Sequence, residues 1–238
     1  MVHSSRRLAL LISRLPTLCE GTPKLLSSSD HIRFLSRALP SENRRKWRLL
    51  FTTARDGCSF TRFVGLTTHR APCLLVIRDS TGAIFGGFAA SPLAVAPQFA
   101  GSYGSFLFSL SPGAPAVHRA SGDSPNLVYL NAGMDVLPNG LAFGGNLEAL
   151  FFGLWLRDDL ETGRSNGPCQ AYSNSPCLAS ATEFKVDEIE ASVPRPHTPY
   201  SRRFRRFPSG DTPASLSPHR GCARLPGDSA RLQACSPR

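Results

Sequence analysis

The stretch that most constrains the fold runs from residue 139 to residue 165 and reads NGLAFGGNLEALFFGLWLRDDLETGRS. Aromatic and aliphatic residues dominate its first two thirds, glycines interrupt them, and a charged segment follows at residues 157–163. Apolar runs with glycine at their bends are typical of buried strands whose backbones approach closely. We therefore predict a pair of buried strands, followed by an acidic segment in which the chain returns to the surface.

Similar short runs recur along the chain, and turn residues such as Ser111-Pro112-Gly113 and Pro138-Asn139-Gly140 separate them. The β-prone runs occupy residues 47–53, 73–77, 83–88, 105–110, 127–130, 141–143, 152–156 and 184–189. The alternation of apolar and polar residues is interrupted once within 184–189, which predicts a β-bulge. Many short strands, frequent turns and few helices indicate a mostly β (α+β) domain, an antiparallel β-sandwich flanked by short helices.

The runs at 73–77 and 83–88 surround the turn-like segment Asp79-Ser80-Thr81-Gly82, which predicts a hairpin. Gly86 and Gly87 inside the second run indicate either a bulge or close backbone packing. A phosphate-binding loop is disfavoured, because no helix start or matching glycine pattern follows them.

Two short helices are predicted beside the sandwich. Ser29 or Asp30 would cap the first, which Pro40 would end, and Ser59 would cap the second. Their inward-facing side chains would be Ile32, Leu35 and Leu39 in the first helix, and Phe60, Phe63 and Val64 in the second.

The charge of the chain lies in its flanks. The formal net charge is +10, but residues 1–46 and 191–238 carry +6 and +7, and residues 47–190 carry −3. Residues 1–28 are predicted to be a weakly ordered basic arm, and residues 191–238 a disordered tail rich in Pro, Ser and Arg. Basic residues ordered on a folded face are lacking, so no specific nucleic acid is predicted. The run from Arg202 to Arg206 has a composition that suits weak contact with an anionic membrane or RNA, although a solvated tail is the simpler interpretation.

The seven cysteines are scattered, without a C-x-x-C pair or a zinc-like cluster with histidine. A structural metal is therefore not expected, and this cysteine usage favours a reducing compartment. Cys73 fits a small buried hydrophobe. The apolar run at residues 8–12 is short for a signal peptide and too short to span a bilayer, and an Arg- and Ser-rich transit peptide is the alternative.

Two groups of residues are candidates for a chemical role, and each also has a simpler structural interpretation. Asp158, Asp159 and Glu161 offer carboxylates for an acid/base pair, or form a solvated acidic loop that Gly163 closes. Cys58 lies near Arg55, and a cation favours a reactive thiolate, but Asp56 opposes that effect. The histidines His69 and His118 lack a recognisable nucleophile beside them.

The ordered series of motifs resembles the TLDc domain family. It consists of WRLLF at 47–51, RDGCSF at 55–60, LLVIRD at 74–79, IFGGF at 84–88, SFLF at 105–108 and FGLWLRDDLETGRS at 152–165. The resemblance covers residues 31–190, and we place the domain at 29–190. Within the family, the segments LPSE at 39–42, THRAPC at 68–73, FGGFA at 85–89 and PNGL at 138–141 are most similar to a lysosome-associated branch linked to mTOR.

The resemblance implies a β-sandwich with short helices and a non-enzymatic interaction module without a cofactor. It implies protein partners, either mTOR pathway components or subunits of the vacuolar proton-pumping ATPase (V-ATPase). The expected location is the cytoplasm and the lysosomal membrane, and the expected role includes the stress response. The alternative is an antioxidant, enzyme-like domain that consumes peroxide through Cys58 or through Asp159 and Glu161. The family-motif positions map here onto Trp47, Asp56, Gly57, Phe60, Asp79, Gly86, Gly153, Trp155, Asp159, Glu161 and Gly163.

The chain departs from the family pattern at its last strand. That strand usually ends in an acidic residue, an aliphatic residue and tryptophan, whereas Ala191 and Ser192 follow Glu190 here. Loss of a buried tryptophan would cost about 3–5 kcal/mol. An alternative splice or exon end would produce this pattern, which transcript sequencing across codon 190 would test.

Overall fold

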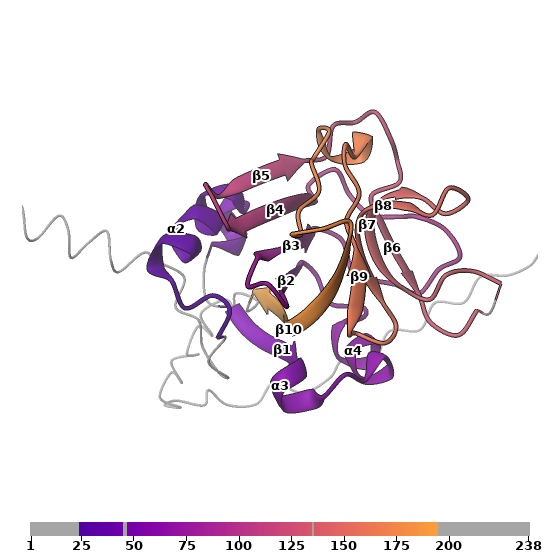
Figure 1. Cartoon of the computed structure of the whole chain (residues 1–238), viewed down its shortest axis with the longest axis horizontal. Helices are drawn as coiled ribbons and strands as arrows, with labels where there is room; N and C mark the ends of the chain where they lie inside the picture. Colours follow the sequence, from indigo (N-terminus) through magenta and orange to yellow (C-terminus); the bar gives the residue numbers. More distant parts are fainter. Residues whose placement is uncertain (1–23, 45–46, 135, 195–238) are drawn as a thin grey trace, which may run out of the picture. The chain divides into compact units, whose positions relative to one another are not determined.

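The computed structural model describes residues 24–44, 47–134 and 136–194. Most of the predicted basic arm, the N-terminal apolar run and the Arg202–Arg206 cluster lie outside these ranges. Within the described residues the chain forms ten strands and a few short helices (Figure 1). The strands are β1 (Trp47–Thr52), β2 (Cys73–Asp79), β3 (Ile84–Ala89), β4 (Phe106–Ser111), β5 (Ala116–Arg119), β6 (Val128–Asn131), β7 (Gly140–Asn146), β8 (Phe151–Arg157), β9 (Thr162–Arg164) and β10 (Glu183–Pro194).

All of the strand pairs are antiparallel, and the strand order is β5-β4-β3-β2-β10-β9-β8-β7-β6. Strand β10 joins the two halves, because its first residues pair with β9 and its later residues pair with β2. The end of β10 also pairs with β1, with Trp47 opposite Pro194. In Figure 1, β10 and β9 lie between the strands β2–β5 and the strands β6–β8.

The two sheets face each other across the main core. Side chains of β2–β4 and of β7–β8 meet there, and Phe143 of β7 lies against the position of Gly87 on β3. A second apolar cluster covers the opposite face of β2–β4, where Leu35 and Leu39 pack with Trp47. The predicted mostly β, antiparallel sandwich is therefore the observed fold.

The bulge predicted in the last strand is confirmed, because the register between β10 and β2 shifts between Val186 and Glu188. Before the shift, Phe184 and Val186 pack into the main core, and after it Ile189 and Ala191 do so. Since side chains alternate along a strand, one extra residue exchanges the two faces. The bulge therefore turns Glu188 and Glu190 away from the main core.

The helices are α2 (Ser29–Ala38), α3 (Thr53–Asp56), α4 (Phe60–Thr67) and the 3₁₀ turns Ser41–Asn43 and Gln170–Tyr172. Ser59 caps α4 as predicted, and its hydroxyl accepts a hydrogen bond from the amide of Arg62 at 3.3 Å. The predicted cap of α2 is wrong by one residue, because the N-cap is Ser28, whose side chain forms no capping hydrogen bond. None of the helices within the described residues has the length and apolarity to cross a bilayer.

The β2–β3 hairpin and the β7–β8 pair form as predicted. Gly86 and Gly87 mark close packing rather than a bulge, since the β2–β3 register is regular at both. Strands β5 and β9 were not predicted, because their short sequences, AVHR and TGR, contain few residues that favour strands. Order also extends past two expected limits, since Leu25 and Leu26 are buried and β10 continues beyond Glu190.

Candidate functional site

The family-motif residue Asp56 lies at the end of α3, where its side chain is fully covered. Its carboxylate accepts hydrogen bonds from Arg55 at 2.6 Å, from the amide of Thr52 at 3.1 Å and from Arg62 at 2.9 Å. The bond from Arg55 is the main cause that lowers the pKa of Asp56 to about 2, against the effect of burial. Asp56 is therefore ionised at neutral pH and holds β1, α3 and α4 together. Gly57 follows with a φ of 72°, which ends α3 in the left-handed region that favours glycine.

Asp79 plays the same structural role at the β2–β3 turn. It is 1% exposed, and one oxygen accepts hydrogen bonds from the Thr81 hydroxyl at 2.6 Å and the Ala83 amide at 3.0 Å. The other oxygen accepts from the hydroxyl and the amide of Ser180. Burial raises the pKa of Asp79, but these hydrogen bonds outweigh it, so the pKa is lowered.

Asp159 closes the β8–β9 turn. Its oxygens accept hydrogen bonds from the amides of Glu161 and Thr162 at 2.8 and 2.9 Å and from the Thr162 hydroxyl at 2.7 Å. Burial alone would raise the pKa of Asp159, but these hydrogen bonds outweigh it, so the pKa is lowered. Asp158 and Glu161 are exposed, which fits the solvated acidic loop rather than an acid/base pair.

The remaining motif positions serve packing. Trp47 and Phe60 are buried, and Trp155 packs against Phe152 with its ring centroid 4.6 Å away. A Cβ atom at Gly86, Gly153 or Gly163 would overlap a neighbouring backbone or side chain. Glycine is therefore required at these three positions, because neighbouring atoms approach the backbone closely there.

The structure brings Cys58 close to Asp159 and Glu161, which the sequence alone did not place together. Cys58 is exposed at the surface, but neighbouring atoms remove part of the water around its thiol. This desolvation, and after it the negative charges of Glu161 and Asp159, raises the pKa of the thiol. A raised pKa lowers the fraction of reactive thiolate at neutral pH. The acidic neighbours thus act against the redox interpretation.

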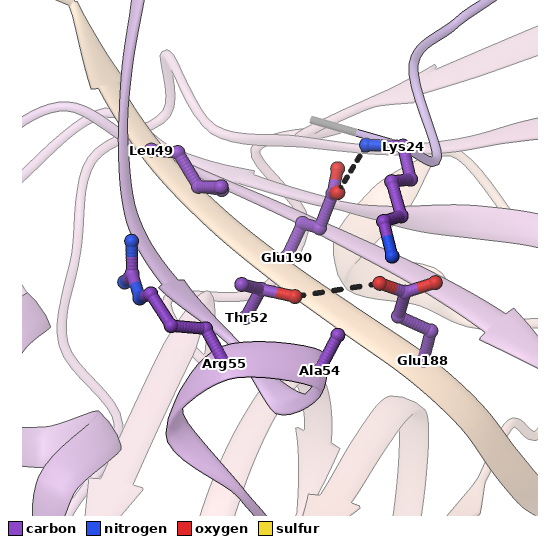
Figure 2. A pocket seen from close by; sticks show the side chains of 7 residues that line it. All are labelled: Lys24, Leu49, Thr52, Ala54, Arg55, Glu188 and Glu190. Carbon is purple, nitrogen blue, oxygen red and sulfur yellow. Dashed lines mark hydrogen bonds between the residues drawn. The ribbon is translucent and has the colours of Figure 1, made fainter. Parts of the chain in front are cut away.

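A surface pocket of about 230 Å³ lies between β1, α3, β10 and the segment that precedes α2. Figure 2 shows its lining, with Glu188 and Glu190 projecting from the same face of β10. Both glutamates are buried, at 7% and 2% exposure, although they border this open pocket. The full lining is Lys24, Leu49, Thr52, Ala54, Arg55, Glu188 and Glu190.

The two carboxylates have different partners. Glu188 accepts hydrogen bonds from Arg78 at 2.9 Å and from the Thr52 hydroxyl at 3.4 Å. One oxygen of Glu190 accepts from the backbone amide of Lys24 at 2.5 Å, whereas the other, Oε2, is buried without a partner. Burial is the main cause that raises the pKa of Glu190, and the charge of Glu188 adds to it, whereas the backbone amides of Lys24 and Leu25 and the charge of Arg78 oppose the rise. Because a buried carboxylate oxygen without a hydrogen-bond partner is costly, Oε2 of Glu190 is the candidate contact point for an incoming group.

Glu188, Glu190 and Lys24 were not among the site residues predicted from the sequence. The slip in alternation at residues 184–189 is the signal that could have found the two glutamates, since a bulge exchanges the faces that follow it. Among the described residues, no group of three His, Cys, Asp or Glu side chains is placed to hold a metal ion.

Comparison with known proteins agrees with this geometry. The TLDc domain family matches residues 21–191. Human MTOR-associated protein MEAK7 is 39% identical over 161 residues, which cover 67% of this chain and 34% of that protein. The mouse protein of the same name is 41% identical over 159 residues, covering 66% of this chain and 34% of that protein. Human Oxidation resistance protein 1 is 34% identical over 177 residues, covering 74% of this chain and 19% of that protein.

The chain therefore spans about a third of the length of the MEAK7 proteins that it resembles. The match to the family covers more than half of the chain and includes every strand of the sandwich except the last residues of β10. On the family match, the fold and the motif residues that hold its turns, the chain belongs to the TLDc domain family.

Proposed function

We propose that this chain is a protein-interaction module in mTOR signalling. The observation that carries the proposal is its similarity to the MTOR-associated proteins MEAK7 of human and mouse. The geometry agrees, because the carboxylates of Asp56, Asp79 and Asp159 are engaged in holding turns. The pocket beside β10, in contrast, holds a buried carboxylate oxygen without a hydrogen-bond partner.

The finer parts of the proposal concern location and partners. We place the module in the cytoplasm and at the lysosomal membrane, where it contacts mTOR pathway components or subunits of the V-ATPase. A non-enzymatic role is supported by the hydrogen-bonded carboxylate of Asp159 and by the raised pKa of Cys58.

Affinity capture from cells tests this proposal. The tagged full chain is expected to co-purify mTOR pathway components or cytosolic V-ATPase subunits, and to sediment with lysosomes. The Asp79→Ala variant serves as a destabilised control, and near-UV circular dichroism of both purified proteins shows whether each is folded. A folded chain that captures neither set of proteins would refute the proposal.

The similarity to Oxidation resistance protein 1 supports a second candidate, an antioxidant role. The direct form of this role, peroxide consumption by Cys58, predicts that Cys58→Ser abolishes the activity of the purified chain. We expect no such loss, because the thiol lies beside two negative charges that raise its pKa. Cys177→Ser, which changes another free cysteine, is the matched control.

A further inference from the structure

The pocket beside β10 combines a buried carboxyl group with an apolar wall. Glu190 is 2% exposed, and its Oε2 atom has no hydrogen-bond partner. Leu49 and Ala54 contribute apolar surface to the same pocket. Desolvation makes a carboxylate with an unpartnered oxygen unfavourable, so a cation that enters the pocket gains more there than at an exposed acid.

The arginine side chains near the pocket already have partners other than Glu190. Arg55 donates to Asp56 and to the carbonyl of Leu50, and Arg78 donates to Asp187 and Glu188. Lys24 contacts Glu190 through its backbone amide. Among the described residues, no side-chain cation forms an ion pair with Glu190.

We propose that this pocket receives a lysine or arginine side chain of a partner protein, with Glu190 as its counter-ion and Glu188 beside it. The inference rests on the proposed function, since it gives the interaction module a contact point. A basic side chain fits on two counts, because its charged end meets the carboxylates and its aliphatic stem lies along Leu49 and Ala54. A metal ion fits less well, since the described residues place only two acidic side chains in the pocket.

Lys24 is the internal competitor for this site. Its side chain is exposed, and Figure 2 shows it extending over the pocket toward Glu188. The hydrogen bond to Glu190 comes from the backbone of Lys24, so Lys24→Met removes the charge and leaves that bond in place. Lys24→Met should therefore strengthen the binding of a cation, whereas Glu190→Gln should weaken it.

The experiment titrates the isotope-labelled full chain with Nα-acetyl-arginine methylamide and with Nα-acetyl-lysine methylamide, and follows backbone amide shifts by NMR. The citrulline analogue has nearly the same shape as the arginine probe without its charge. Calcium and magnesium chloride form a separate arm. The variants are Glu190→Gln, Glu188→Gln, Lys24→Met and the matched control Glu183→Gln, an exposed acid of the same strand outside the pocket.

We expect a basic probe to shift the amides of Thr52, Ala54 and Glu190, and the citrulline analogue to bind at least about tenfold more weakly. Glu190→Gln should lower the affinity by about tenfold, Glu183→Gln should leave it unchanged, and Lys24→Met should raise it. Glu188→Gln should weaken binding less than Glu190→Gln, and it keeps the test valid if Glu190→Gln unfolds.

Equal binding of the citrulline analogue, no response to the basic probes, or shifts with the divalent cations alone would each overturn the inference. So would weaker binding in Lys24→Met. A chain that captures mTOR pathway components but ignores the probes refutes only this inference. A chain that binds the probes through Glu190 but captures no protein refutes the proposed function instead.

Discussion

Replacing Asp79 with alanine tests whether a family-motif residue serves the fold rather than a reaction. Its two oxygens accept five hydrogen bonds, from the amides and hydroxyls of Thr81 and Ser180 and from the amide of Ala83. These bonds link the β2–β3 turn to a loop 101 residues away in the sequence. Alanine would remove all five acceptor contacts at once.

The expected loss of stability in Asp79→Ala depends on which of the hydrogen-bond donors water can reach. Thr81 and Ser180 are exposed, so water replaces much of what they lose, at about 0.5 kcal/mol for each bond. The amide of Ala83 is buried and would be left unsatisfied, at about 1–3 kcal/mol. The total is about 3–5 kcal/mol, which is a large part of a typical stability of about 5–15 kcal/mol.

Urea denaturation followed by tryptophan fluorescence measures this loss, since Trp47 and Trp155 are both in the folded core. A drop in melting temperature of about 6–20 °C should accompany it. Asp79→Asn keeps one acceptor oxygen but turns an NH₂ group toward one set of donors, so it should cost less than alanine. A loss below about 1 kcal/mol for Asp79→Ala, with an unchanged denaturant slope, would refute this account of the residue.

Ser180→Ala completes a double-mutant cycle with Asp79→Asn. The side chains meet at 2.8 Å, so their effects on the free energy of unfolding should not add, and the coupling should be about 0.5–1.5 kcal/mol. Additive effects would mean that the Ser180 loop is held by other contacts.

Three further predictions concern stability. Gly86→Ala should destabilise the chain by about 1–3 kcal/mol or more in urea denaturation, because the new Cβ atom overlaps the carbonyl of Leu75; its control, Gly65→Ala in α4, has open space and should stabilise it by about 0.5–1 kcal/mol. Asp56 has a lowered pKa of about 2, so it stabilises the fold above about pH 4 and loses that contribution as the pH falls toward 2. Asp56→Asn should therefore lower the free energy of unfolding at pH 7 by about 1–2 kcal/mol, a modest loss because the arginine partners are half exposed. Its melting temperature should fall at pH 7 and depend less on pH between about 4 and 2. Ser59→Ala should cost about 1 kcal/mol through loss of the α4 cap, measured by thermal unfolding, and Ser59→Asp should restore it.

Local signals in the sequence were sufficient for much of the fold. The β2–β3 hairpin, the β7–β8 pair, the cap at Ser59 and the bulge in β10 were all predicted. Each depends on residues close together in the chain, namely a turn between apolar runs, a capping hydroxyl or a break in alternation. The family resemblance likewise depends on short ordered motifs, and the match over residues 21–191 confirms it.

The pocket was decided only by the tertiary structure. Glu188 meets Thr52, which lies 136 residues away in the sequence, and Glu190 meets the amide of Lys24, 166 residues away. Strand β9 has only three residues, so it depends on hydrogen bonds from β8 and β10 rather than on its own propensity. Burial and partners of a charged residue depend on what the rest of the chain packs around it. For that reason the sequence could indicate a bulge in the last strand, but not that the bulge turns two glutamates into a pocket.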